Sequence, residues 1–321
     1  MSPDEVEAAA RRYVPGDGAV SVERLGRGLV NESHRVRRDG RMYSLRLPAG
    51  QRAAGQRAAA QVAARAATHV PIGVDREWEC RVLAAASAAG IAPLIECCEP
   101  RLGVLVARWQ EGHTLSAEEA RRPETGARVA ELVRRMHALP LPANARVLYA
   151  ADWIERYRGV RAPRTQDRAA DALLKAEAVQ RLAALEAAPR GPAVLCHSDL
   201  HPANLVVAER GLILLDWEYA HVSEGLWDIA GWACNNDLDP AARALLLASY
   251  LGRPVLASEE RRLENLGWLY DYVCLLWSEV YCGASDAPDA RVRALILERG
   301  RVLAARLARR AGGGPGELPA N

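Results

Sequence analysis

The chain has 321 residues, of which 50% are hydrophobic, and a formal net charge of +2 at pH 7. That length and composition suit a globular protein with a large buried core and exclude an extended scaffold. The small net charge, without a basic run interleaved with aromatic residues, argues against a nucleic-acid partner. The N-terminus lacks the pattern of a signal peptide, and no apolar run is long enough to cross a membrane. The sequence therefore predicts a soluble cytoplasmic protein with no membrane segment.

The cysteines support a reducing compartment. There are seven, an odd number, without paired C-x-x-C motifs, and the adjacent Cys97 and Cys98 fall in a predicted buried strand. We therefore expect reduced thiols in the core rather than disulfides or zinc ligands.

The first third of the chain alternates strand-like runs with turn signals. Strands are expected at 20–25, 33–37 and 43–48, and Asp39-Gly40 marks the hairpin turn between the last two. A glycine-containing loop, 26–31, joins the first two strands, although such a loop is a weak signal on its own. After a predicted helix at 75–89, strands at 93–97 and 103–108 would complete a five-stranded sheet.

A low-complexity segment separates the third strand from this helix. Residues 49–73 are rich in Ala, Gln and Arg and contain the near repeat QRAAG-QRAAA. Because large apolar residues that could anchor a helix are missing, we expect a mobile or weakly helical insert, either a flap or a spacer without a role.

From residue 123 onward the sequence is mostly helical, because apolar residues recur at three- and four-residue spacing. Long helices are expected at 241–251, 259–281 and 290–309, followed by a disordered tail rich in Gly and Pro. The expected domains are a lobe of residues 1–110 with the insert 49–73, a helical lobe of residues 111–310, and the tail 311–321.

The most informative motif of the chain runs from His197 to Asn204. Asp199 stands five residues before Asn204, which is the spacing of the loop H-R-D-x-x-x-x-N that orients a hydroxyl and holds magnesium in kinases. The runs 205–208 and 212–215 predict a hairpin that would bring Asp216 beside Asn204. Because Asp216 would supply a second metal ligand beside Asn204, chance is a poor explanation of the motif.

A competing interpretation takes His197, Asp199 and His201 as alternating ligands of zinc or iron in a metal-assisted hydrolase. Alternation requires an extended strand, yet Pro202 follows at once, and that scheme gives Asn204 and Asp216 no role.

The phrase Leu214-Leu215-Asp216-Trp217-Glu218-Tyr219, with the loop before it, resembles the choline/ethanolamine kinase branch of the aminoglycoside-phosphotransferase-like kinases, to which bacterial thiamine kinases are related. The resemblance implies an α+β, bilobal, protein-kinase-like fold, with a five-stranded antiparallel sheet and one helix in the small lobe and a larger, mainly helical second lobe. It also implies ATP and Mg²⁺ as cofactors and an amino alcohol as substrate, in a monomer or homodimer.

The same resemblance implies a role for each matching residue. Asp199 accepts the hydroxyl proton, His197 braces the loop, and Asn204, Asp216 and Glu218 hold the metal, while Asp228 supports the loop through backbone hydrogen bonds. The implied nucleotide contacts are Gly28 and Asn31 of the glycine loop, Arg46 with its acidic partner Glu79, and Arg108 and Gln110 of the hinge.

One position of the glycine loop departs from the family pattern, and Arg46 departs from the protein kinases, although related small-molecule kinases also use Arg there. Val30 stands where Thr is usual, and Arg46 stands where protein kinases have Lys, in a chain whose only lysine is Lys175. Glu77 is the alternative acidic partner, and an ordinary surface ion pair is the alternative interpretation of Arg46 and Glu79.

Ten of the chain's seventeen aromatic residues lie between residues 217 and 281. They could form a cage for a quaternary ammonium group through cation–π contacts. The alternative is core packing, since the chain contains no Phe. The expected substrate contacts are Glu218, Tyr219, Trp227, Trp268, Tyr272 and Trp277.

The predicted reaction is transfer of the ATP γ-phosphoryl group to a primary alcohol, and choline or ethanolamine is the first candidate for this alcohol. A thiamine or aminoglycoside kinase shares every catalytic residue and is the alternative, and GTP is an alternative donor. A noncatalytic nucleotide-binding member of the fold is the third hypothesis.

Overall fold

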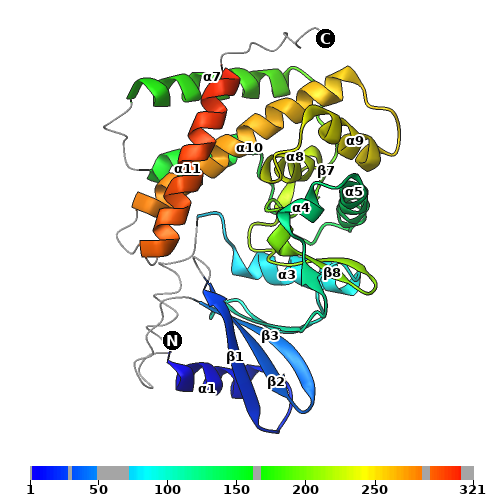
Figure 1. The fold of residues 1–321 in the computed structure, drawn as a ribbon, viewed down its shortest axis with the longest axis vertical. Helices are drawn as coiled ribbons and strands as arrows, with labels where there is room; N and C mark the ends of the chain where they lie inside the picture. The colour runs from blue at the N-terminus through cyan, green and yellow to red at the C-terminus, as the bar shows by residue number, and fades with distance from the viewer. Residues whose placement is uncertain (1, 28–30, 49–71, 162–167, 284–289, 312–321) are drawn as a thin grey trace. The chain divides into compact units, whose positions relative to one another are not determined.

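The computed structural model describes residues 2–27, 31–48, 72–161, 168–283 and 290–311 (Figure 1). The chain forms two compact units. The first contains residues 1–115, 142–144 and 203–220, and the second contains residues 116–141, 145–202 and 221–321. Gly28, most of the 49–73 insert and the tail from residue 312 lie outside the described residues. Segment 203–220 joins the first unit from the later part of the chain.

The first unit contains the predicted five-stranded antiparallel sheet, with strand order β1-β2-β3-β5-β4. Side chains alternate between buried and more exposed along β2 and β3, as expected for strands with one face against a core. Val36, Tyr43, Leu45 and Val106 form that core and are at most 1% exposed. The strands are β1 (Val20–Arg27), β2 (Asn31–Arg38), β3 (Arg41–Pro48), β4 (Ile95–Glu99) and β5 (Val104–Arg108).

Two helices accompany this sheet, where the sequence analysis expected one. The expected helix is α3 (Arg76–Ala88), which begins after Asp75, whose side chain accepts a hydrogen bond from the Trp78 backbone. The additional helix is α1 (Pro3–Tyr13), which buries Val6 and Ala10 against the sheet core (Figure 1). Ser2 and Glu5 form a capping box at its start, so a sequence signal for this helix was present.

A second, three-stranded sheet of the first unit contains the hairpin that follows the catalytic loop. Its strands are β6 (His113–Thr114), β8 (Leu205–Ala208) and β9 (Gly211–Leu214), in the order β6-β8-β9. Leu205 pairs with Leu214, and the Leu215 N–H donates to the Asn204 carbonyl oxygen at 2.8 Å. The predicted hairpin therefore brings the chain segments of Asn204 and Asp216 together.

The second unit is mainly helical and is organised around α10, which packs against α6, α7, α8 and α11 (Figure 1). Leu269, Trp268 and Leu276 of α10 are fully buried. A two-stranded sheet pairs β7 (Ala193–Cys196), which leads into the predicted catalytic loop, with β10 (His221–Glu224), which comes after the hairpin. The helices are α4 (Ala117–Ala120), α5 (Pro123–His137), α6 (Ala150–Val160), α7 (Arg168–Glu186), α8 (Leu226–Asn235), α9 (Pro240–Leu251), α10 (Ala257–Gly283) and α11 (Ala290–Ala311).

The cysteine prediction was wrong at one pair. Cys80 of α3 and Cys98 of β4 form a disulfide, with their Cα atoms 5.9 Å apart. These residues are 18 positions apart on different elements, and the packing of α3 beside β4 brings them together. Their spacing along the sequence therefore does not predict the pairing. The remaining cysteines are free thiols.

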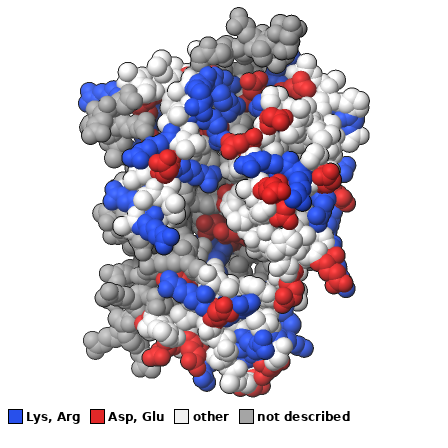
Figure 2. Space-filling view, in the orientation of Figure 1, with Lys and Arg blue, Asp and Glu red and all other residues white. Residues whose placement is uncertain are grey.

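The described surface carries charges of both signs. On the face shown in Figure 2, basic and acidic side chains are interspersed. None of the helices in the described ranges is both long enough and apolar enough to cross a membrane.

Candidate active site

In the first unit, Arg46 of β3 and Glu79 of α3 form a two-pronged ion pair, with nitrogen–oxygen distances of 2.6 and 2.8 Å. Only 12% of the Arg46 side chain and 1% of the Glu79 side chain are exposed, so the alternative of an ordinary surface pair does not hold. Burial tends to raise the pKa of Glu79, but Arg46 and Arg76 outweigh it and lower that pKa. Glu79 is therefore an ionised anchor that fixes the Arg46 guanidinium.

The fixed guanidinium faces the segment that follows the hairpin. Arg46 Nη1 lies 3.5 Å from the Asp216 Oδ1 atom, and the buried Arg46 Nε has no hydrogen-bond partner among the described residues. An orphaned donor beside a carboxylate is suited to a phosphate oxygen, which would satisfy it. Arg46 thus has both the charge and the spare donor that a nucleotide phosphate needs.

A second arginine, Arg76, joins this network and was not expected from the sequence. Its Nη1 lies 2.7 Å from Glu79 Oε2 and 3.1 Å from Glu218 Oε2. Its Nη2 donates to Asn31 Oδ1 at 3.2 Å, and Asn31 Nδ2 donates to Glu218 Oε2 at 3.0 Å. The network therefore ties the start of β2, helix α3 and the Asp216-Trp217-Glu218 segment together.

Negative charge is concentrated at the end of the hairpin. Burial, followed by the neighbouring charge of Asp216, raises the pKa of Glu218 to about 7, although Arg76 and Arg46 oppose the shift. Asp216 has a left-handed backbone with φ of 57°, uncommon for a residue other than glycine and frequent at functional sites.

The residues present fit a magnesium ion. Asp216, Glu218 and the amide of Asn204 offer hard oxygen ligands, which Mg²⁺ prefers. Burial and the charge of Asp216 raise the pKa of Glu218, and a divalent cation would offset the repulsion between these two carboxylates. These three residues belong to one compact unit.

The expected hinge residues have modest contacts. Arg108, at the end of β5, is ion-paired with Glu96, and its guanidinium lies over the Tyr43 ring, 5.2 Å from the centroid. Gln110 is half-buried just after this strand.

In the second unit, Asp199 is the predicted catalytic carboxylate. His201 Nε2 lies 3.5 Å from its Oδ2 atom, and 32% of the Asp199 side chain is exposed. Burial tends to raise the pKa of Asp199, but the hydrogen bond and charge of His201, with weaker contributions from His197 and Arg299, lower it. Asp199 is therefore ionised and able to accept a hydrogen bond from a hydroxyl at neutral pH.

Asp228 of α8 makes the contacts that the resemblance implied for it. Its carboxylate accepts hydrogen bonds from the backbone N–H groups of His197, at 2.9 Å, and Ser198, at 2.7 Å. Ser198 has a φ of 70°, so these bonds hold a backbone conformation that is costly for a side chain with a Cβ. The buried His197 ring accepts from the Asp199 N–H at 3.3 Å. The loop is thus held from both sides of Ser198.

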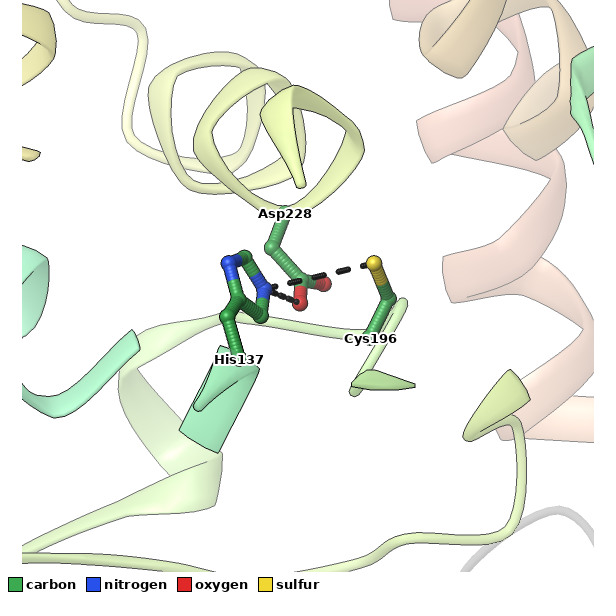
Figure 3. A group of neighbouring side chains, drawn as sticks. All are labelled: His137, Cys196 and Asp228. Carbon is green, nitrogen blue, oxygen red and sulfur yellow. Dashed lines mark hydrogen bonds and ion pairs between the residues drawn. The ribbon is translucent and has the colours of Figure 1, made fainter. Parts of the chain in front are cut away.

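The side chains of His137 and Cys196 lie beside Asp228 (Figure 3). The His137 Nε2 atom lies 3.1 Å from the Asp228 carboxylate, which requires the ring proton there, and His137 Nδ1 lies 2.9 Å from the Tyr250 hydroxyl. Cys196 Sγ lies 4.0 Å from the same His137 Nε2 atom. Burial raises the pKa of the Cys196 thiol well above its usual value, so the sulfur is a poor metal ligand. We interpret the cluster as a brace.

The alternative zinc or iron site is not supported. Within the described ranges, one group of His, Cys, Asp or Glu side chains has at least three ligand atoms within 4.8 Å of one another, and it is His137, Cys196 and Asp228. His197, Asp199 and His201 form no such group there.

Most rings of the expected ammonium cage lie in the core. Trp227, Trp268 and Tyr272 are at most 2% exposed. The Trp268 face is occupied by the Arg181 guanidinium, 5.2 Å from the ring centroid, and the Tyr272 hydroxyl accepts from Arg158 at 2.6 Å. Tyr219 and Trp277 are half-buried, and Trp277 packs on Tyr281 with ring centroids 4.5 Å apart. Core packing therefore accounts for the first three rings.

Solved structures share this fold across nearly the whole chain. A choline/ethanolamine kinase family protein from Mesorhizobium loti is 23% identical, with a TM-score of 0.73 over 98% of this chain and 96% of that one. The choline kinase LicA from Streptococcus pneumoniae is 18% identical, with a TM-score of 0.71 over 95% and 98%. A spectinomycin phosphotransferase in complex with ADP and spectinomycin is 11% identical, with a TM-score of 0.61 over 97% and 99%. No curated protein sequence matches the chain.

The fold is therefore the α+β, protein-kinase-like fold that the sequence predicted, as its structural neighbours among choline/ethanolamine kinases and aminoglycoside phosphotransferases demonstrate. The sequence profile of the phosphotransferase enzyme family matches residues 21–264, which include the Arg46–Glu79 pair, the catalytic loop and the hairpin that follows it. By this match, the chain belongs to the phosphotransferase enzyme family.

Proposed function

We propose that this protein is a kinase that transfers the γ-phosphoryl group of ATP to the hydroxyl group of a small molecule. The acceptor oxygen forms a bond to the γ-phosphorus, the bond from this phosphorus to the β–γ bridging oxygen breaks, and ADP leaves with the electron pair. Asp199 accepts the hydroxyl proton. The observation that carries the proposal is the Arg46 guanidinium, fixed by the buried Glu79 and 3.5 Å from Asp216.

The residues of the first unit would bind the nucleotide phosphates. The unpartnered Arg46 Nε and its fixed charge suit a phosphate oxygen. Asn204, Asp216 and Glu218 would hold Mg²⁺, which supplies charge neutralisation for the phosphates. Asn31 and Arg76 would set the position of Glu218, since both contact its Oε2 atom. Arg108 and Gln110 are the candidates for contact with the base.

The residues of the second unit would handle the acceptor. The lowered pKa of Asp199 keeps it ionised, and its charge orients the hydroxyl as the proton leaves. Asp228 fixes the loop backbone on the N-terminal side of Asp199, with His137 behind it. This arrangement reduces the reorganisation that the reaction requires.

Choline and ethanolamine are the first acceptors to test, because the most similar folds named above include choline and ethanolamine kinases. Thiamine and an aminoglycoside are the alternatives, since a spectinomycin phosphotransferase shares the fold. The protein is proposed to act in the cytoplasm as a monomer or homodimer.

The test is Mg²⁺-dependent ADP release by the wild type and by Asp199→Asn, with each acceptor offered separately. We expect acceptor-dependent release that falls by about a thousandfold in Asp199→Asn, while ATP affinity is nearly unchanged. Asp4→Asn, at an exposed position of α1, is the control and should behave like the wild type. Near-normal turnover by purified Asp199→Asn would refute the assignment of the base.

A further inference from the structure

Arg299 of α11 is linked through hydrogen bonds of Asn235 to the backbone of the predicted catalytic loop, within the second unit. Its neighbours along the helix are neutralised: Arg306 is ion-paired with Asp237 and Asp271, and Arg310 lies 3.0 Å from Asp271. Arg299 contacts an amide instead, because its Nη2 donates to Asn235 Oδ1 at 2.9 Å. Among the described residues no carboxylate forms an ion pair with Arg299, and its side chain is exposed. Within the described part of the chain, this positive charge is thus held in place by an amide and not by a carboxylate in direct contact.

Asn235 connects this charge to the catalytic loop. Its Nδ2 donates to the Leu200 carbonyl oxygen at 2.8 Å and to the Tyr270 hydroxyl at 3.0 Å. Leu200 directly follows Asp199 in the chain, so one amide side chain bridges the guanidinium and the backbone beside the proposed base. Burial tends to raise the pKa of Asp199, and the charge of Arg299 helps to lower it, after the larger contributions of His201 and His197. A molecule whose hydroxyl reaches Asp199 therefore lies in the field of Arg299.

Asp199 is the described carboxylate whose charge reaches Arg299, and the other two carboxylates of this neighbourhood have their own partners. Asp228 is bonded to the loop backbone and His137, and Asp271 is held by Arg306 and Arg310. A quaternary ammonium group is bound by accessible ring faces and carboxylates. An oxyanion is bound by a guanidinium, whose planar fork matches two oxygen atoms. The surroundings of Asp199 in the second unit fit the oxyanion.

We infer that the acceptor alcohol carries an oxyanion group, a carboxylate or a phosphate ester, and that Arg299 binds this group as a specificity-determining residue. The inference rests on the proposed kinase function, and it selects a hydroxylated acid over choline and ethanolamine. Asn235 holds the Arg299 guanidinium in position through one hydrogen bond and leaves its remaining donors for the ligand.

The first measurement compares acceptors that differ by the oxyanion alone. Serine is ethanolamine with an added carboxylate, and glycerol 3-phosphate is glycerol with an added phosphate, so the two pairs also distinguish the two sources of the charge. We expect a higher kcat/KM for the charged member of at least one pair. Arg299→Met should then raise the KM for that acceptor by about 10- to 100-fold with little change in kcat, and Arg299→Lys should recover part of the loss. An acceptor without an oxyanion that outperforms every charged one would overturn the inference.

The second measurement needs no turnover. Inorganic phosphate is titrated by calorimetry into the full-length protein saturated with Mg²⁺ and a non-hydrolysable ATP analogue, which occupies the donor phosphate positions. We expect binding that weakens by about 10-fold or more in Arg299→Met. Arg301→Met is the matched control, since Arg301 lies on the same helix, is 77% exposed and pairs with Glu298. Equal phosphate affinity in wild type and Arg299→Met would overturn the inference.

These outcomes separate the two proposals. Phosphate binding that depends on Arg299, without ADP release for any acceptor, supports the oxyanion site and counts against the kinase function. Strong ADP release with choline, unaffected by Arg299→Met, supports the kinase function and rejects the oxyanion site.

Discussion

At the scale of single residues, Glu218 carries a strongly perturbed carboxyl group in the first unit. Its pKa of about 7 lies above the usual value of 4.5, so the folded protein holds a proton that the unfolded chain has lost between these two pH values. The metal-free protein should therefore lose stability as the pH rises through this window, by up to about 3 kcal/mol at 1.36 kcal/mol per pH unit. Urea unfolding in EDTA at pH 5 and pH 8 measures this slope.

The matched variant is Glu218→Gln. Its free energy of unfolding should lack the pH dependence that comes from Glu218 and keep the pH dependence that comes from other groups. Added Mg²⁺ should reduce the slope in the wild type, because the metal binds the ionised form. Identical pH dependence in the wild type and Glu218→Gln would show that burial does not perturb Glu218 as described.

Arg76 provides a second prediction, since it contacts two buried carboxylates. The exposed fractions of the Arg76, Glu79 and Glu218 side chains are 10%, 1% and 8%. Arg76→Met should lower the free energy of unfolding by about 3 kcal/mol, because it leaves buried negative charge with fewer partners. Urea unfolding measures the loss, and Arg101→Met, in an exposed turn, is the control.

A double-mutant cycle tests the mechanism of this loss. If charge causes it, adding Glu218→Gln to Arg76→Met should restore part of the stability. Additive losses in the double variant would instead mean that Arg76 acts through its packing alone.

The sequence was informative for residues within one motif and silent for residues that meet across elements. The spacing of Asp199, Asn204 and Asp216 along the chain is the signal for their predicted roles, and the hairpin that this spacing required is present. Arg76 and Asn31 lie 45 residues apart, and Arg299 and Asn235 lie 64 apart, so those contacts depend on packing that no local pattern encodes. The aromatic residues show another limit of the sequence. A ligand cage and a hydrophobic core contain the same residue types, so composition does not distinguish them.

At the scale of elements, α3 is fixed at two places. Glu79 anchors it to β3 through Arg46, and the next residue, Cys80, anchors it to β4 through the disulfide with Cys98. Reduction with dithiothreitol should lower the free energy of unfolding by about 3 kcal/mol, because the bond closes a loop of 18 residues. Thermal unfolding with and without the reductant measures this effect.

The control for this prediction is the double variant Cys80→Ser, Cys98→Ser, which should unfold at a lower temperature and be insensitive to dithiothreitol. A wild type that contains no disulfide when purified under air, by mass spectrometry after alkylation, would contradict the pairing. It would then support the reduced thiols that the sequence analysis expected.

The elements themselves were largely predictable, because alternation in β2 and β3 and helical spacing in the second unit are strong signals. Helix α1 was not predicted, although Ser2 and Glu5 have the spacing of a capping box at its start.

At the scale of the whole molecule, the first unit is discontinuous in sequence, since residues 203–220 return to it. β8 pairs with β6, the Leu214 N–H donates to the Ile91 carbonyl oxygen, and Trp78 Nε1 donates to the Ala220 carbonyl oxygen at 2.7 Å. A fragment of residues 1–115 should therefore lack a cooperative thermal transition, since Trp78, buried in the native unit, loses this partner.

The matched fragment joins residues 203–220 to residues 1–115 through a flexible Gly/Ser linker. Circular dichroism should show a sharper and higher transition for the joined fragment than for residues 1–115 alone. Equal transitions would mean that the returning segment contributes nothing to the stability of the first unit.

The use of arginine at position 46 has a practical consequence for how such an enzyme is detected. Nucleotide probes that carry an acyl phosphate label kinases by acylating a lysine beside the ATP phosphates, and a guanidinium stays protonated and does not react in this way. The chain's only lysine, Lys175, is exposed on α7 of the second unit, whereas Arg46 belongs to the first unit. Surveys that find kinases through a reactive lysine at this position would therefore not detect the proposed kinase by labelling residue 46.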